Sequence, residues 1–186
     1  VGADPQAERK IVGKMLEQMP VNIPLLGFWA AADEGLGEYE GIKFMSAYGK
    51  FMAVNTHIAS ASFHAGMPVA PTVFTQNAQK EKAARAVLDP TKIYVAFSVQ
   101  ESGDAPCYWK FRQYEPWEDP ARGSIPISWC VGAATADVVP DVLAWYYSQA
   151  TPNDYFYSAL SGAGYMNPMA GYGTAYRDAA AVFDDF

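Results

Sequence analysis

The distribution of hydrophobic and polar residues along the chain predicts helices and strands in alternation. Apolar residues at helical spacing indicate amphipathic helices, and short apolar runs bounded by turn residues indicate buried strands. The predicted helices span residues 5–18, 38–48, 76–87, 139–150 and 174–186. The predicted strands span residues 23–29, 51–55, 92–99, 125–130 and 154–159. Residues 56–75 are predicted to be loop, and residues 105–118 show no decisive period.

The order of these elements predicts the fold class. Since strands alternate with helices, we expect an α/β fold in which repeated βα units place parallel strands inside a layer of helices. The stretch 92–99 is the strongest strand prediction because it is rich in β-branched and aromatic residues. A closed barrel needs eight strands and roughly 250 residues, whereas this chain has 186. We therefore expect a TIM-barrel-like arrangement that is open or incomplete. No linker divides residues 1–186, which are predicted to form a single domain that is part of a longer protein.

Composition and charge narrow the classes of partner. The chain is 51% hydrophobic and 18% charged, which is the profile of a globular protein with a sizeable core. Its aromatic content of 15% fits either an aromatic core or a cleft lined for sugar binding. A net charge of −7 disfavours nucleic acid, because the phosphate backbone would be repelled. No apolar run approaches the roughly 20 residues that span a bilayer, and the first residues do not resemble a signal peptide.

Carboxylates follow three of the predicted strands. In parallel α/β folds, ligands bind at the carboxyl ends of the strands. Glu34 follows the first predicted strand, Glu101 and Asp104 follow the strand 92–99, and Asp137 follows the strand 125–130. Carboxylates act as acid, base and nucleophile in glycoside hydrolysis. Each of these residues also has a structural interpretation. Glu34 could be a solvated charge, and Asp104 could be a turn or cap residue. Asp137 could be a helix N-cap, and for this residue we prefer the structural interpretation.

The histidines and cysteines give weaker signals. His57 and His64 fit no standard metal spacing, although His57 with Asp104 and Glu34 would make a divalent-metal or proton-transfer site if their loops converge. We therefore predict no metal as the first choice. Cys107 and Cys130 form either one disulfide or two buried thiols, and no base near Cys107 in the sequence supports a nucleophilic role.

The segment Gly162-Ala163-Gly164-Tyr165-Met166-Asn167-Pro168 is the most specific motif in the chain. Its two glycines permit positive φ and a close approach of backbone to backbone or to ligand. Tyr165 adds an aromatic ring with a polar tip, and Pro168 stiffens the exit from the segment.

This segment resembles the motif of the GxGYxYP family, and residues 139–168 are similar to the family's stretch leading into it. The runs Pro24–Trp29, Asp33–Glu34 and Ser46–Lys50 are also similar to family segments, so the resemblance extends from about residue 10 to about residue 175. It implies a barrel-like α/β domain that acts on glycans, in exported proteins with a further N-terminal domain. An extracellular or periplasmic location is therefore expected.

The sequence departs from the family pattern at two places. Asn167 stands where the motif has its second tyrosine. The family's D-G-D-N segment reads Ser102-Gly103-Asp104-Ala105 here, so only Asp104 carries over from it. Gly162, Gly164, Tyr165 and Pro168 carry over from the motif.

Three functional hypotheses follow from the residues and the resemblance. In the first, a glycoside hydrolase uses Asp104 and Glu34 as its acid and its base or nucleophile, with Glu101 as a further catalytic candidate. The substrate-binding candidates of that enzyme are Trp29, Trp129, Gly162, Gly164, Tyr165 and Asn167. The second hypothesis is a glycan-binding module without catalysis on the same fold, favoured by the changes at Ser102 and Ala105. The third is a metal-dependent carbohydrate esterase or deacetylase that uses His57.

Overall fold

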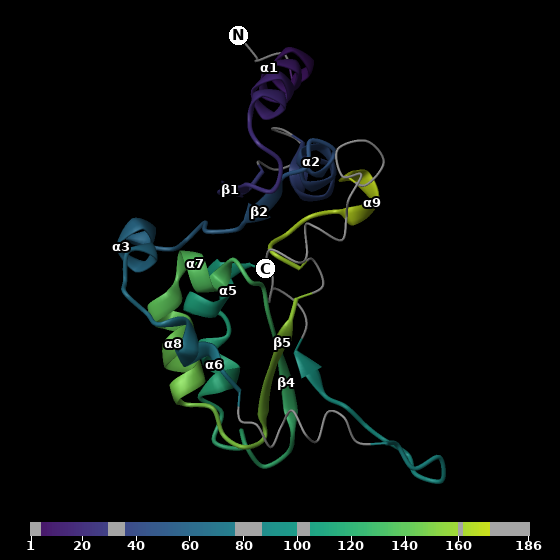
Figure 1. Cartoon of the computed structure of the whole chain (residues 1–186), viewed down its shortest axis with the longest axis vertical. Coiled ribbons are helices and arrows are strands. Elements are labelled where there is room, and N and C mark those ends of the chain that lie inside the picture. Colours follow the sequence, from purple (N-terminus) through teal and green to yellow (C-terminus); the bar gives the residue numbers. More distant parts are fainter. Residues whose placement is uncertain (1–4, 30–35, 77–86, 100–104, 160–161, 172–186) are drawn as a thin grey trace.

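The computed structural model describes residues 5–29, 36–76, 87–99, 105–159 and 162–171. Its helices are α1 (Pro5–Gln18), α2 (Gly37–Ser46), α3 (Ala61–Ala65), α5 (Pro106–Phe111), α6 (Tyr114–Trp117), α7 (Thr135–Val138), α8 (Pro140–Ser148) and α9 (Pro168–Gly171), with a 3-10 turn η1 (Pro71–Phe74). Its strands are β1 (Pro24–Leu26), β2 (Phe51–Ala53), β3 (Ser98–Val99), β4 (Ile127–Val131) and β5 (Asp154–Ser158). Figure 1 shows α1, α2, α9 and the strands β1 and β2 towards one end of the molecule, and β4, β5 and the helices α5 to α8 towards the other.

Both sheets of the described structure are parallel. β1 pairs with β2, and β3, β4 and β5 form a second sheet in that order. This confirms the predicted α/β fold with parallel strands. Within the described residues these sheets do not close into a barrel. Among the helices of this part of the chain, none is long and apolar enough to cross a membrane.

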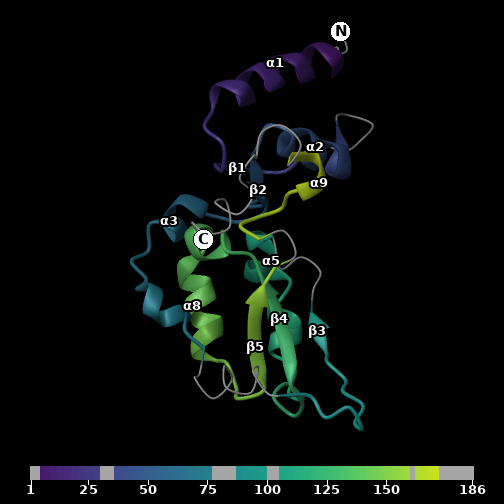
Figure 2. The ribbon, with the colours of Figure 1, turned by 45° about the vertical axis from the view of Figure 1, so that its right-hand side comes forward.

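Helices cover one face of the second sheet (Figure 2), and an aromatic core lies between the helices and the sheet. Its buried members come from α5, α6, β4, α8 and β5, and are Trp109, Trp117, Trp129, Tyr146 and Phe156. The Trp117 ring stacks on Phe156 with centroids 5.8 Å apart, and meets the Trp129 and Tyr146 rings edge-on at 5.0 and 4.9 Å. Aromatic pairs at such separations are favourable beyond the area that they bury. Part of the high aromatic content therefore serves the core.

Helices and strands with clear sequence patterns are found where predicted. The helix predicted over residues 5–18 is α1, and those over 38–48 and 139–150 correspond to α2 and α8. The strands predicted over 51–55, 125–130 and 154–159 correspond to β2, β4 and β5. The helices predicted over 76–87 and 174–186 lie almost entirely or entirely outside the described residues.

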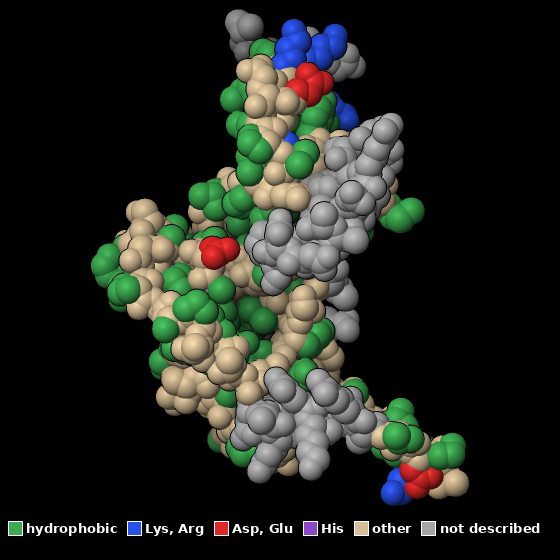
Figure 3. Space-filling view, in the orientation of Figure 1, with side chains coloured by type: hydrophobic (Ala, Val, Ile, Leu, Met, Phe, Trp, Pro, Cys, Tyr) green, Lys and Arg blue, Asp and Glu red, His purple; other side chains and the backbone are tan. Residues whose placement is uncertain are grey.

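The prediction for residues 92–99 is wrong for most of the stretch. Only Ser98 and Val99 form a strand, and residues 87–97 make an exposed arm in which Ile93 is 94% and Val95 73% exposed. Figure 3 shows this arm projecting at the lower right, with exposed hydrophobic side chains and a charged tip. Strand propensity reflects the fit to a paired, half-buried surface. Among the described contacts of the arm, only its last residue, Phe97, meets a strand, where its carbonyl accepts a hydrogen bond from the Ser128 amide of β4. The composition of the arm alone therefore did not determine its conformation.

Other predictions failed in smaller ways. The strand within residues 23–29 is short and exposed rather than buried, with Leu26 64% exposed, because it pairs only with β2 among the described strands. The predicted loop 56–75 contains α3 and η1, and the ambiguous stretch 105–118 forms α5 and α6.

Asp137 is not an N-cap, since it lies inside α7 and Val139 precedes α8. Cys107 and Cys130 are both buried thiols, and no disulfide joins them.

A buried ion pair fixes the start of β5. Asp154 is 1% exposed, and its Oδ2 accepts hydrogen bonds from Arg122 Nη1 at 2.5 Å and from the Thr151 amide and hydroxyl at 2.8 Å each. Its Oδ1 accepts from Trp129 Nε1 at 2.8 Å, and the Arg122 guanidinium lies 4.1 Å from the centre of the Trp117 ring. Burial acts to raise the pKa of Asp154, but the hydrogen bonds from Thr151 and Trp129 and the charge of Arg122 outweigh it and lower the pKa. The carboxylate is thus held ionised within the core.

Replacing Asp154 with asparagine is expected to reduce the free energy of unfolding by roughly 3–5 kcal/mol at neutral pH, because Arg122 would keep its charge without its partner. Since the pKa is lower in the folded state, the unfolded chain binds more protons as the pH falls below about 4. The unmodified protein should therefore lose stability over that acidic window, and Asp154→Asn should lose less. Urea unfolding across pH measures both effects. Asp137→Asn, an exposed control on α7, should behave like the unmodified protein, and unchanged stability of Asp154→Asn at neutral pH would contradict the expectation.

Candidate functional site

The glycine-rich motif connects the two sheets at the carboxyl end of β5. The Tyr165 amide donates to the Met52 carbonyl and the Met52 amide donates to the Tyr165 carbonyl, both at 2.8 Å, which makes an antiparallel bridge to β2. The Ala163 carbonyl accepts a hydrogen bond from the Ala134 amide at 2.8 Å, just beyond β4. The motif, which follows β5, therefore connects to β2 itself and to the segment that follows β4. We call Gly162 to Asn167, with Met52, the joint.

Glycine is required at two positions of the joint. Gly162 has φ of 70°, a conformation that other residues rarely adopt. A Cβ atom on Gly164 would lie 2.6 Å from Phe51 Cδ2 and 2.9 Å from the Met52 carbonyl oxygen. The close approach that the motif predicts is thus an approach to β2, to both the Phe51 ring and the Met52 backbone.

The polar groups of the joint contact α2. The Tyr165 hydroxyl donates to Glu38 Oε1 at 2.8 Å, and the Asn167 amide donates to the buried Ser46 hydroxyl at 2.9 Å. Tyr165 is half-buried and Glu38 is exposed, so a phenol and a carboxylate meet at the surface here. Glu38 was not among the sequence candidates. Its position in the first turn of a helix carries no functional signal of its own.

Two of the predicted sugar-stacking rings, Trp129 and Trp29, pack against other side chains of the protein. Trp129 is 1% exposed and has no ring face open to a ligand. Trp29 is half-buried against Phe44, with ring centroids 6.3 Å apart, and lies where a side chain on Gly41 would collide with it. The structure thus gives both tryptophans a packing role.

The three catalytic candidates Glu34, Glu101 and Asp104 lie outside the described residues. Their segments follow β1 and β3, and the convergence of their side chains remains a prediction. His57 is exposed, with φ of 65° and its ring edge-on to Phe111. No group of three or more His, Cys, Asp or Glu side chains in the described ranges is placed to hold a metal ion. Burial raises the pKa of the Cys107 thiol, which disfavours a thiolate nucleophile.

A second group of polar side chains meets in a pocket between helices. His64 Nδ1 lies 2.8 and 3.0 Å from the two carboxylate oxygens of Asp141, and Lys110 Nζ lies 2.7 Å from His64 Nε2. Since a carboxylate only accepts, Nδ1 carries the proton, and Nε2 accepts a hydrogen bond from Lys110. The pocket has a volume of about 350 Å³. It is lined by His64, Trp109, Lys110, Tyr114, Asp141, Val142, Trp145 and Tyr146.

Sequence reasoning missed this helix pocket. His64 was considered only for metal spacing, and Asp141 and Lys110 were not candidates. His64 is 77 positions from Asp141 and 46 positions from Lys110 in the sequence, so no local motif indicates these contacts. Burial raises the pKa of Tyr146, so this lining residue is a neutral phenol.

Another cavity, of about 460 Å³, lies beside β5. At its wall the Gln76 side chain donates to the Phe156 carbonyl at 2.6 Å and accepts from the Phe156 amide at 3.0 Å. Gln76 thereby satisfies backbone groups on the edge of β5, which is a structural role.

Comparison with known proteins relates the chain to one family. Residues 91–184 match the model described as "GxGYxYP putative glycoside hydrolase C-terminal domain", and residues 2–66 match "GxGYxYP third domain". No curated protein matches the sequence. A crystal structure described as "a putative hydrolase from Bacteroides thetaiotaomicron VPI-5482" is similar, with 19% identity and a TM-score of 0.79. The match covers 98% of this chain and 34% of that chain, and at this identity it shows the fold alone.

Replacing Gly164 with alanine is expected to destabilise the protein by about 1–3 kcal/mol, because the new methyl group would force Phe51 and the Met52 backbone to move. Hydrogen exchange at the Met52 and Tyr165 amides should accelerate in the same variant. Gly66→Ala is the matched control, since its Cβ would approach the Ser62 carbonyl oxygen no closer than 3.4 Å. Equal stability of the two variants in urea, with unchanged exchange at Met52, would exclude the close approach.

Proposed function

Because the chain belongs to the GxGYxYP family, we propose that it is the substrate-side part of a glycoside hydrolase acting on an extracellular or periplasmic glycan. Family membership is the observation that carries this proposal. We further propose that its parallel strands belong to an open or incomplete TIM-barrel-like arrangement in a longer protein, in which residues 1–186 act as one unit.

The strand topology supports the proposed location of the chemistry. Parallel strands present their carboxyl ends at the same edge of one sheet. β1 and β3 belong to different sheets, and the backbone bridge between Met52 of β2 and Tyr165 beyond β5 joins these two sheets.

The segment that holds Glu34 follows the carboxyl end of β1. The segment that holds Glu101 and Asp104 follows the carboxyl end of β3. The joint lies beyond the carboxyl end of β5, and its Tyr165 hydroxyl meets the Glu38 carboxylate of α2 at the surface. We propose that the substrate binds where the two sheets meet, beside Tyr165, with Glu34 contributed from the side of one sheet and Asp104 from the side of the other.

In this proposal, Asp104 and Glu34 perform the two carboxyl roles of glycoside hydrolysis. One protonates the leaving oxygen, and the other acts as nucleophile or activates water. A separation of roughly 5 Å between the two carboxyl groups would indicate retention, and roughly 6.5–9.5 Å inversion. Glu101 is the alternative partner for Asp104.

One observation favours a second function, a glycan-binding module without catalysis. Ser102 and Ala105 replace an aspartate and an asparagine of the family's D-G-D-N segment. If the missing groups perform the chemistry, the fold would retain binding and lose turnover.

Asp104→Asn and Glu34→Gln are each expected to lower kcat/KM on a glycan substrate by about 10²–10⁴-fold, the contribution of a general acid or base. The measurement screens the full-length protein against chromogenic aryl glycosides and natural oligosaccharides. Glu17→Gln, an exposed carboxylate change on α1, is the control and should retain full activity.

Activity that survives both substitutions would overturn the carboxylate assignment. Glycan binding without turnover in the unmodified protein, unchanged in both variants, would select the binding module. Loss of turnover with a chelator would instead point to the metal-dependent esterase or deacetylase that uses His57.

A further inference from the structure

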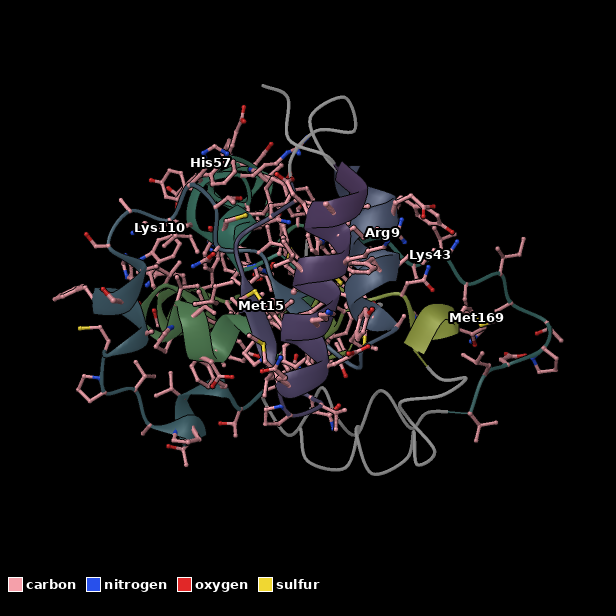
Figure 4. All side chains as sticks on the ribbon, turned by 90° about the horizontal axis from the view of Figure 1, so that it is seen from above. Arg9, Met15, Lys43, His57, Lys110 and Met169 are labelled. Carbon is pink, nitrogen blue, oxygen red and sulfur yellow. The ribbon has the colours of Figure 1, made fainter. Side chains whose placement is uncertain are left out.

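We propose that the helix pocket is a second carbohydrate site, which binds one uncharged sugar ring away from the strand ends. The identification of the ligand as a sugar rests on the proposed function, whereas the site itself rests on the geometry below. Its lining residues come from α3, α5, α6 and α8, and none belongs to a strand. Figure 4 shows Lys110 on the opposite side of the molecule from Lys43 of α2 and Met169 of α9.

The size and walls of the pocket suit a pyranose. A volume of about 350 Å³ falls at the lower end of the range for small-molecule sites. Tyr114 and Trp145 are 51% and 38% exposed, with ring centroids 6.0 Å apart and planes inclined by 34°. Two such rings offer apolar faces to the C–H groups of a sugar.

The polar groups of the helix pocket can both donate hydrogen bonds to sugar hydroxyls and accept hydrogen bonds from them. Lys110 has three N–H donors and uses one on His64, so two remain for a ligand. The Asp141 carboxylate has about four acceptor sites, and His64 Nδ1 occupies part of that capacity. A sugar hydroxyl can donate to Asp141 and accept from Lys110, so neighbouring hydroxyls would satisfy both.

The charge of the cluster selects a neutral ligand. Lys110 and Asp141 carry opposite charges, and His64 is neutral when its Nε2 accepts from Lys110. A carboxylate on the ligand would gain from Lys110 but meet the Asp141 charge across a small pocket. An uncharged sugar avoids that repulsion.

The hydrogen-bond chain also holds the site ready for a ligand. His64 is 9% exposed and contacts both Asp141 and Lys110. A flexible lysine normally loses side-chain entropy on binding, and a lysine already held by His64 loses less. His64 is therefore a positioning residue for the two side chains that would contact the sugar.

The test measures binding of neutral methyl pyranosides and methyl hexuronides by calorimetry and NMR, in the full-length protein carrying Asp104→Asn so that no glycan is consumed. Lys110→Met and Tyr114→Ala are each expected to weaken neutral-sugar binding at least about tenfold. The matched controls are Lys10→Met on α1 and Tyr39→Ala on α2, both exposed in the parent protein, and they should bind as the parent does. Without any pocket substitution, the Trp145 indole N–H resonance should shift on adding sugar, which keeps the test independent of variant folding.

The absence of any sugar binding would overturn the proposal, as would equal binding by the pocket variants and their controls, or a tenfold preference for hexuronides. Failure of the proposed hydrolysis is distinguishable from these results. In that case the unmodified protein turns over no glycan, yet Lys110→Met and Tyr114→Ala still weaken binding.

Discussion

The pair of hydrogen bonds between Met52 and Tyr165 is the constraint on which the arrangement of this molecule depends. Met52 lies in the stretch that matches the family's third domain, and Tyr165 lies in the stretch that matches its C-terminal domain. Gly164 permits this contact by leaving room for the β2 backbone. The motif that identifies the family therefore acts here as a structural connection between two matched regions. The motif also places one polar group at the surface, the Tyr165 hydroxyl, which donates a hydrogen bond to Glu38.

A second constraint is the way in which the core admits polar groups. The aromatic cluster surrounds Trp117, and beside it Asp154 forms an ion pair with Arg122. A buried carboxylate is tolerated only when its charge is paired and its oxygens accept hydrogen bonds. Trp129 supplies one of those hydrogen bonds, which explains why a residue expected to stack on a sugar lies inside. The same rule fixes the start of β5, where the Asp154 carboxylate accepts hydrogen bonds from Arg122, Thr151 and Trp129.

The sequence predicted the elements whose signals are local. The period of apolar residues located α1 and α8, and short apolar runs located β2, β4 and β5. It could not predict the arm at 87–97, because whether a β-branched stretch forms a strand depends on a neighbour that local composition does not reveal. The helices α5 and α6 were missed because six and four residues are too few to show a helical period. The prediction that Asp137 caps a helix was wrong because a short helix, α7, contains Asp137 and extends to Val138. The N-cap position of α8 is therefore Val139.

The candidate sites also differ in whether their signal is local in the sequence or arises only when distant residues meet in the fold. The motif at 162–168 was recognisable because its glycines, tyrosine and proline are adjacent, and the structure places them at the predicted end of β5. The helix pocket joins His64, Lys110 and Asp141 from three helices, and only folding brings them together. Polar residues scattered through a sequence carry no spacing signal, yet aromatic side chains around them can exclude water and strengthen their mutual contacts. A site of this kind depends on helix packing, so the aromatic core that supports the sheet also determines where those three side chains meet.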